Sequence, residues 1–296
     1  MTEMTLSLVN RLIEKQFPHW YGLSLNPIHS YGTDHHIFRL GTDKLIRFPR
    51  VEWADLQIKK EHRFLPTLAQ GLPLAIPNPI ALGLPDEGYP WHWGIYKWIS
   101  GQNATLEQLS NPIQEAKVLA QFINALQRIS PADGPPPGQH NVFRGVPLAR
   151  RDEAVRTAIS NLQTTHINTK AAAQAWEHAL QTPEWVGPPV WVHGDLHPGN
   201  LLVERGKLSA VIDFGALCVG DPANDLIVAW DLFSADARDV FRDALSIDED
   251  TWSRGRGWAL SFGLIALSIY MESNPMLTEI SQRLIAEVLA DFNVKN

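Results

Sequence analysis

The chain of 296 residues is long enough for one large domain or for two lobes that share a cleft. Its content of 45% hydrophobic and 19% charged residues is typical of a folded globular protein and excludes general disorder. The net charge of −7 argues against nucleic acid and anionic membranes as partners. The single cysteine, Cys218, excludes an intrachain disulfide and fits a reducing compartment, so we expect a cytoplasmic protein.

The pattern of apolar residues gives no sign of membrane insertion. The longest strongly apolar helical stretch, residues 258–271, is shorter than the roughly 20 residues that cross a bilayer. The first residues carry charges at helical spacing and lack the apolar core of an export signal. We therefore expect a buried helix at 258–271 and no membrane partner.

The first third of the chain alternates between helical and strand patterns. A helix, three strands and a second helix are expected at residues 5–17, 25–48 and 53–70. Gly41, Thr42 and Asp43 separate two of the apolar runs and have the composition of a hairpin turn. After a proline-rich segment, residues 91–99 are rich in aromatic and β-branched side chains and predict a strand that leads to a candidate hinge at Gly101.

From residue 111 onward the pattern is mainly helical. Helices are expected at residues 111–128, 149–163, 169–181, 222–245 and 250–292. Residues 130–138 contain four prolines and two glycines and predict a loop. Within residues 189–220, short β-type runs surround polar turns that contain glycine, so we expect a small β island inside the helical part.

A group of polar residues in the β island has the composition of a phosphoryl-transfer site. His193, Asp195 and Asn200 follow the first strand run, and Asp213 begins an Asp-Phe-Gly group thirteen residues after Asn200. Phosphoryl transfer needs a carboxylate near the incoming hydroxyl and oxygen ligands that hold Mg²⁺ on the phosphates. Asp195, Asn200 and Asp213 supply these groups.

The segments HGDLHPGN and IDFGALCVGDPANDL resemble the aminoglycoside phosphotransferase family, small-molecule relatives of the protein kinases. GTDHHIFRLGTDKLIRFPR, KKEHRFLPTLA and GYPWHWGIYKWISG resemble the same family's small lobe and hinge. The resemblance implies an α+β, protein-kinase-like two-lobed fold, with a small antiparallel sheet in a nucleotide-binding lobe (1–99) and a mostly helical catalytic and acceptor-binding lobe (100–296). It also implies an enzyme that moves the γ-phosphate of ATP or GTP to a hydroxyl of a small molecule. The acceptors it suggests are an aminoglycoside or related antibiotic, an amino alcohol or a sugar metabolite.

The resemblance implies a role for each residue of the motif. Asp195 would be the catalytic base, and Asn200 and Asp213 would be the ligands of Mg²⁺. His193 would hold the loop by hydrogen bonds. Asp221 and Asp225 match acidic positions that would cap a helix and brace the catalytic loop.

Four residues of the small lobe and hinge would bind the nucleotide. Arg47 stands where many relatives have a strand lysine, and Glu61 matches its ion-pair partner on the following helix. By the same resemblance, adenine would meet the hinge backbone near Lys97 and Ile99. The turn from Gly32 to His36 would cover the phosphates.

Other interpretations of these residues remain open. His193, Asp195 and His197 have ligand-type side chains at a spacing that suits Zn²⁺ or Mn²⁺. The arginine at position 47 leaves room for a catalytically weak, nucleotide-binding regulatory protein. Cys218 is expected to be an inert buried thiol.

The stretch 221–250 carries nine acidic residues and two arginines, a pattern typical of solvated helix faces. A polyamine-like acceptor would exploit such a field. Asp231 is a candidate contact for it.

Overall fold

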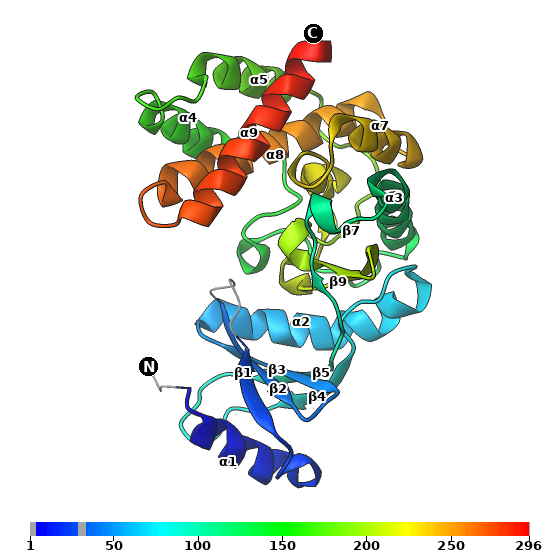
Figure 1. Ribbon diagram of the computed structural model, residues 1–296, viewed down its shortest axis with the longest axis vertical. Coiled ribbons are helices and arrows are strands. Elements are labelled where there is room, and N and C mark those ends of the chain that lie inside the picture. Colours follow the sequence, from blue (N-terminus) through cyan, green and yellow to red (C-terminus); the bar gives the residue numbers. More distant parts are fainter. Residues whose placement is uncertain (1–3, 29–33, 296) are drawn as a thin grey trace.

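The computed structural model describes residues 4–28 and 34–295, and in it a sheet-containing N-terminal part is followed by a mainly helical C-terminal part (Figure 1). Helix α2 (Glu52–Leu68) lies between the sheet and the rest of the chain. This architecture is the predicted α+β fold with a small antiparallel sheet and a mostly helical second part.

Five antiparallel strands form the N-terminal sheet in the order β1-β2-β3-β5-β4. They are β1 (Leu25–Ile28), β2 (His35–Leu40), β3 (Lys44–Pro49), β4 (Pro79–Gly83) and β5 (Trp93–Lys97). The predicted turn between β2 and β3 is confirmed, and Gly41 adopts a φ of +60° there, which glycine tolerates best. β4 was not expected in the proline-rich segment. It lies at the edge of the sheet, where a proline such as Pro79 is tolerated.

Helix α1 (Leu6–Gln16) packs on the face of the sheet opposite to α2 (Figure 1). The Thr5 hydroxyl accepts a hydrogen bond from Leu8 N and caps the start of this helix. Buried side chains of α1, of the sheet and of the loop before β5 form one cluster: Leu8, Val9, Leu12, Ile13, Phe38, Leu40, Ile46, Phe48, Tyr89, Trp93 and Ile95. The sheet is thus held by apolar packing on this side, which leaves its other side for α2.

The predicted β island is present and is larger than expected. β7 (Val190–Val192) pairs with β10 (Cys218–Gly220), and a second small sheet has the order β6-β8-β9. Its strands are β6 (Gln102–Asn103), β8 (Leu201–Glu204) and β9 (Lys207–Val211). β6 and β10 are two and three residues long, too short to give a strand pattern in the sequence.

The helices of the C-terminal part agree with the predictions up to residue 181. They are α3 (Pro112–Arg128), α4 (Asp152–Asn161) and α5 (Thr169–Gln181), with a 3₁₀ turn at Leu148–Arg151 before α4. The segment 222–245 is not one helix. Pro222 starts a 3₁₀ helix (Pro222–Ile227), and α6 (Val228–Asp231) and α7 (Ala235–Ala244) follow, separated at Ser234.

The expected helix over 250–292 is also divided. α8 (Glu249–Tyr270) and α9 (Pro275–Lys295) are joined by a turn in which the Asn274 side chain accepts a hydrogen bond from Leu277 N. An asparagine before a proline is a good start for a helix, and the apolar pattern on both sides concealed it. Trp258 and Leu267 of α8 are buried as expected, whereas Ile269 and Tyr270 are exposed. Within the described ranges, no helix is long and apolar enough to cross a membrane.

Candidate active site

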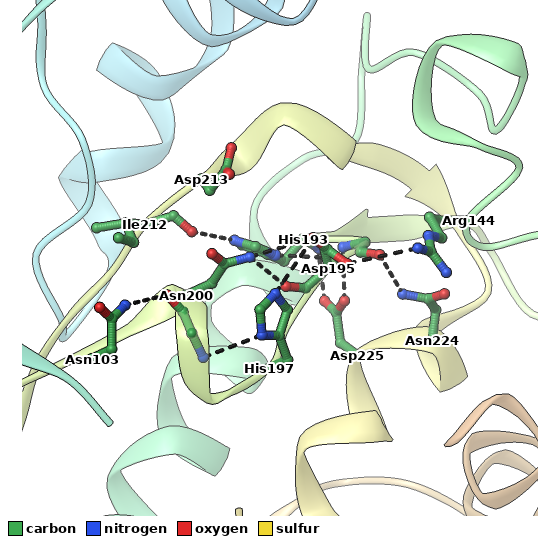
Figure 2. Close-up of polar contacts among 12 residues, drawn as sticks. Asn103, Arg144, His193, Asp195, His197, Asn200, Ile212, Asp213, Asn224 and Asp225 are labelled. Carbon is green, nitrogen blue, oxygen red and sulfur yellow. Dashed lines mark hydrogen bonds and ion pairs between the residues drawn. The ribbon is translucent and has the colours of Figure 1, made fainter. Parts of the chain in front are cut away.

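The loop after β7 carries Asp195 and Asn200 and is tied to the segment before Asp213 (Figure 2). The buried ring of His193 donates from Nε2 to the carbonyl of Ile212 at 3.0 Å and accepts from Asp195 N at Nδ1, at 3.2 Å. These bonds assign the ring hydrogen to Nε2. The hydrogen bonds expected of His193 are thus present.

Asp225 binds the backbone of the same loop, as predicted. Its two carboxylate oxygens accept hydrogen bonds from the backbone N–H groups of His193 and Gly194 at 2.7 and 2.8 Å. Asn224 Nδ2 donates to the carbonyl of Gly194 at 2.9 Å. Gly194 has a φ of +86°, and a Cβ there would lie 2.4 Å from the carbonyl oxygen of Ala216. The loop conformation therefore depends on glycine at this position.

Asn200 turns its amide nitrogen toward Asp195. Nδ2 donates to the Asp195 carbonyl at 2.9 Å and lies 3.4 Å from the carboxylate oxygen Oδ2. Because Nδ2 is engaged, Oδ1 is the atom of this side chain that is left to bind a cation. Ile212 N donates to the Asn200 carbonyl at 2.8 Å, which places Asp213, the next residue, beside Asn200.

An arginine and a histidine lie on either side of the Asp195 carboxylate. His197 Nε2 is 3.7 Å from Oδ2, and Arg144 Nη2 is 3.7 Å from Oδ1. Burial raises the pKa of Asp195, but the opposing effects of His197 and Arg144 are stronger and hold it below its usual range. In return, Asp195 raises the pKa of His197 although burial lowers it. Asp195 is therefore ionised at neutral pH, as a general base must be.

Arg47 connects the sheet to Asp213. Its Nη1 donates to both carboxylate oxygens of Glu61, at 2.8 and 2.9 Å, and its Nη2 donates to Asp213 Oδ1 at 2.7 Å. The expected pair of Arg47 and Glu61 is present, and the contact with Asp213 adds to it. Burial raises the pKa of Asp213, but the charge of Arg47 outweighs it, so the pKa lies below its usual value. The Tyr96 hydroxyl completes the group by donating to Glu61 Oε2 at 2.6 Å.

The two hinge residues lie where the chain leaves the sheet. Lys97 is the last residue of β5, and its N–H donates to the carbonyl of Asn78 at 2.9 Å. Ile99 is half-buried two residues later. Among the described residues, neither forms a hydrogen bond or an ion pair with the loop of Asp195. In the expected phosphate turn, Gly32 and Thr33 lie outside the described residues.

The donor atoms fit Mg²⁺ better than Zn²⁺. Mg²⁺ prefers oxygen ligands, and Asn200 Oδ1 and the Asp213 carboxylate, whose side chain is 45% exposed, supply them from two segments joined by the hydrogen bond between Ile212 N and the Asn200 carbonyl. In the part of the chain that the structure describes, no group of three or more His, Cys, Asp and Glu is arranged to hold a metal. The zinc interpretation fails because both ring nitrogens of His193 bind the backbone.

Three of the nine acidic residues of the stretch 221–250 are buried, so the expectation of solvated helix faces is wrong for these three. Asp221 caps the following 3₁₀ helix through Ala223 N and pairs with Arg254 at 2.8 Å. Asp225 holds the catalytic loop. Burial raises the pKa of Asp231, and the charges of His197 and Arg283 oppose this rise only in part. The other six acidic residues of the stretch are exposed, so most of the acidic charge expected from the sequence does lie at the surface.

Tyr96 and Arg144 were not identified in the sequence. Arg144 comes from the segment after the proline-rich loop and reaches Asp195 across 51 positions, a contact that no local pattern signals. Cys218 lies close by, and its thiol donates to the Arg144 carbonyl. Burial raises the pKa of this thiol to about 12, which agrees with the predicted inert cysteine.

Known proteins show where this chain belongs. Residues 27–258 match the model of a family described as the phosphotransferase enzyme family. No curated protein sequence matches the chain.

Solved structures of similar fold include a mutant of aminoglycoside 2′-phosphotransferase-IIIa in complex with GDP, with 19% identity, 99% of this chain and 100% of that chain covered, and a TM-score of 0.73. The GDP and kanamycin complex of APH(2″)-IIIa has 19% identity, coverage of 96% and 98%, and a TM-score of 0.71. Macrolide 2′-phosphotransferase MphH from Brachybacterium faecium has 20% identity, coverage of 96% and 97%, and a TM-score of 0.60. At these identities the likeness establishes the protein-kinase-like fold, and the family match covers most of the sequence. The chain belongs to the phosphotransferase enzyme family.

Proposed function

We propose that this protein transfers the γ-phosphate of ATP or GTP to a hydroxyl group of a small molecule. The observation that carries the proposal is the arrangement of the catalytic loop, in which the ionised, 34% exposed side chain of Asp195 lies beside Asn200, and the hydrogen bond from Ile212 N to the Asn200 carbonyl ties the loop to the segment of Asp213. Similar structures were determined with GDP, with ATP and streptomycin, and with kanamycin, which supports a nucleotide and a hydroxyl-bearing acceptor as substrates here.

In the proposed mechanism, Asp195 orients the acceptor hydroxyl and takes its proton during in-line attack. Asn200 Oδ1 and the Asp213 carboxylate would hold Mg²⁺, which neutralises charge on the phosphate oxygens when it is bound. Arg47, kept in place by Glu61, would approach the nucleotide phosphates. Residues 1–99 would form the nucleotide-binding lobe and 100–296 the acceptor-binding lobe, with adenine near Lys97 and Ile99.

The test is acceptor-dependent release of ADP or GDP by the purified protein. It is incubated with Mg²⁺ and ATP or GTP and with a panel of aminoglycosides, macrolides, amino alcohols, hydroxy acids and sugars. At least one acceptor should raise nucleoside diphosphate release above the background rate, and EDTA should stop it. Nucleotide binding with only background release across the whole panel would instead support a regulatory protein.

Asp195→Ala separates catalysis from binding. Loss of a general base typically lowers turnover about 10²–10⁴-fold. Nucleotide affinity should stay unchanged, because Asp195 acts on the hydroxyl beyond the γ-phosphate. Full activity of Asp195→Ala would refute its proposed role.

A further inference from the structure

The side chain of Arg144 lies on the acceptor side of Asp195. It contacts Oδ1 of the carboxylate, whereas Asn200 and His197 are on the side of Oδ2. Figure 2 shows Arg144 and Asn200 on opposite sides of Asp195. Because Asn200 and Asp213 mark the proposed position of the phosphates, a hydroxyl that reaches Asp195 from the other side has Arg144 as its neighbour.

The guanidinium of Arg144 is covered but poorly satisfied. Its side chain is only 14% exposed and lies over Phe262, with Cζ 3.8 Å from the ring centroid. Over residues 4–28 and 34–295, its guanidinium makes no hydrogen bond, and the 3.7 Å to Asp195 is too long for one. The five donors of this guanidinium are therefore available to an acceptor from outside the chain.

Arg151 adds a second positive charge against the same aromatic ring. Its Cζ lies 5.2 Å from the Phe262 centroid, and its Nε donates to Ser261 Oγ at 2.8 Å. No carboxylate among the residues placed by the structure lies within ion-pair distance of Arg151. The nearby Asp152 is already engaged, because it pairs with Arg156 at 2.8 Å. Burial, and then the charge of Arg144, lower the pKa of Arg151 to about 10.

The positive charge beside Asp195 therefore exceeds what one carboxylate can neutralise. Asp231 does not neutralise this excess positive charge. The cationic groups that interact with Asp231 are His197 and Arg283, not Arg144 or Arg151. An ammonium group bound here would meet two arginines. An oxyanion would meet a planar fork of donors that suits carboxylate and phosphate geometry.

We infer that the acceptor carries a carboxylate or phosphate group, bound by Arg144 with Arg151 beside it while its hydroxyl faces Asp195. This inference rests on the proposed phosphotransfer and narrows its substrate class. The acceptor would then differ in charge from kanamycin, a polyamine, which occupies the similar structure of APH(2″)-IIIa.

The experiment compares three-carbon polyols that differ in charge: the anionic diols glycerate and glycerol 3-phosphate, the neutral triol glycerol and the cationic diol 3-amino-1,2-propanediol. Binding is measured by calorimetry in the presence of Mg-ADP, and kcat/KM for ADP release is measured with Mg-ATP. In the native protein, glycerate or glycerol 3-phosphate should bind and react best, and the better of the two identifies carboxylate or phosphate as the group recognised. In Arg144→Gln this preference should fall about 10–100-fold, the usual effect of losing a charged hydrogen bond.

Arg150→Gln is the matched control. Arg150 is exposed and stacks on Phe143, with Cζ 3.8 Å from the ring centroid, so its loss should leave the preference unchanged. Arg144→Lys should restore part of the preference, which a merely structural role of Arg144 would not require.

The inference is overturned if 3-amino-1,2-propanediol is preferred, if no anionic diol binds, or if Arg144→Gln and Arg150→Gln behave alike. Binding of an anionic diol through Arg144 without any ADP release would instead refute the proposed phosphotransfer.

Discussion

The charged groups of the sheet and those of the catalytic loop differ in their access to solvent. Arg47 and Glu61 are almost fully buried, with side chains 8% and 0% exposed, and they bind each other through two short hydrogen bonds. The carboxylates of Asp195 and Asp213 are 34% and 45% exposed. The charged side chains that stabilise the fold are buried, whereas those proposed to contact the substrate and the cation are accessible to solvent.

The contact between Arg47 and Asp213 is where the two regions meet. One side chain binds a fully buried carboxylate through Nη1 and an accessible one through Nη2. The buried carboxylate of Glu61 can thus fix the Arg47 side chain, which in turn positions the carboxylate of Asp213. Removing either carboxylate should therefore have different consequences, the first mainly for stability and the second mainly for activity.

The largest effect is expected from Glu61→Ala. It leaves the buried Arg47 with Asp213 as its remaining anionic neighbour and takes the acceptor from the Tyr96 hydroxyl. Breaking a buried ion pair by removing one partner typically lowers the free energy of unfolding by about 3–5 kcal/mol. Urea unfolding measures this loss. A loss below about 1 kcal/mol, the value typical of an exposed pair, would show that the pair of Arg47 and Glu61 contributes little to stability despite its burial.

Asp213→Asn is expected to act on turnover more than on folding. Losing one ligand of the proposed Mg²⁺ should remove several kcal/mol of transition-state stabilisation, or about 10²–10³-fold in kcat. The urea midpoint should shift less than in Glu61→Ala, because Glu61 still binds Arg47. Steady-state kinetics across a range of Mg²⁺ concentrations measures the effect.

The control for this variant is Asp43→Asn, in the turn between β2 and β3. Asp43 pairs with Lys44 and its side chain is 71% exposed. Its substitution should leave both kcat and the Mg²⁺ dependence unchanged. Equal activity of Asp213→Asn and the native protein would remove Asp213 from the metal site.

The sequence predicted the parts of this comparison that follow from local patterns. The spacing of Asp195, Asn200 and Asp213 lies within one short segment, and the helical and strand periods around it are clear. Arg144 could not be predicted, because its position depends on how the segment after the proline-rich loop packs against Phe262.

The same distinction explains the errors in secondary structure. β4 is an edge strand that contains proline, and it is stabilised by its pairing with β5 rather than by its own pattern. The division between α8 and α9 depends on a cap at Asn274 inside a continuous apolar pattern. In each case a long-range contact or a single capping residue determined the secondary structure, and the average hydrophobic pattern of the segment did not reveal it.

A smaller and pH-dependent effect is expected at Lys60, which is buried and whose Nζ lies 3.1 Å from His140 Nδ1. Burial lowers the pKa of Lys60 to about 8, below the 10.5 of an exposed lysine. Between these values the unfolded chain binds more protons than the folded one, so the free energy of unfolding gains a contribution that rises with pH. The full shift corresponds to roughly 3 kcal/mol, most of which falls between pH 7.5 and 10.

Lys60→Met isolates this contribution, because it keeps a long apolar stem and removes the titrating group. Methionine should stabilise the protein relative to lysine at pH 7.5, and the advantage should shrink by about 2–3 kcal/mol at pH 10. Urea unfolding of both proteins at the two pH values measures the difference. A difference between the proteins that does not change with pH would mean that Lys60 is not desolvated in solution.

The smallest effect is expected one residue earlier, at Lys59 on the same helix. Its side chain is 42% exposed and forms an i,i+4 ion pair with Asp55 at 2.7 Å. Asp55 keeps two other partners, the backbone N–H and the Nδ1 of His92, so Lys59→Ala leaves no buried charge unpaired. The free energy of unfolding should fall by about 0.5 kcal/mol or less and should not differ from the native value in 1 M salt, because exposed pairs are weak and screened. If Lys59→Ala instead proved as costly as Glu61→Ala, burial would not be what separates framework charges from surface charges in this protein.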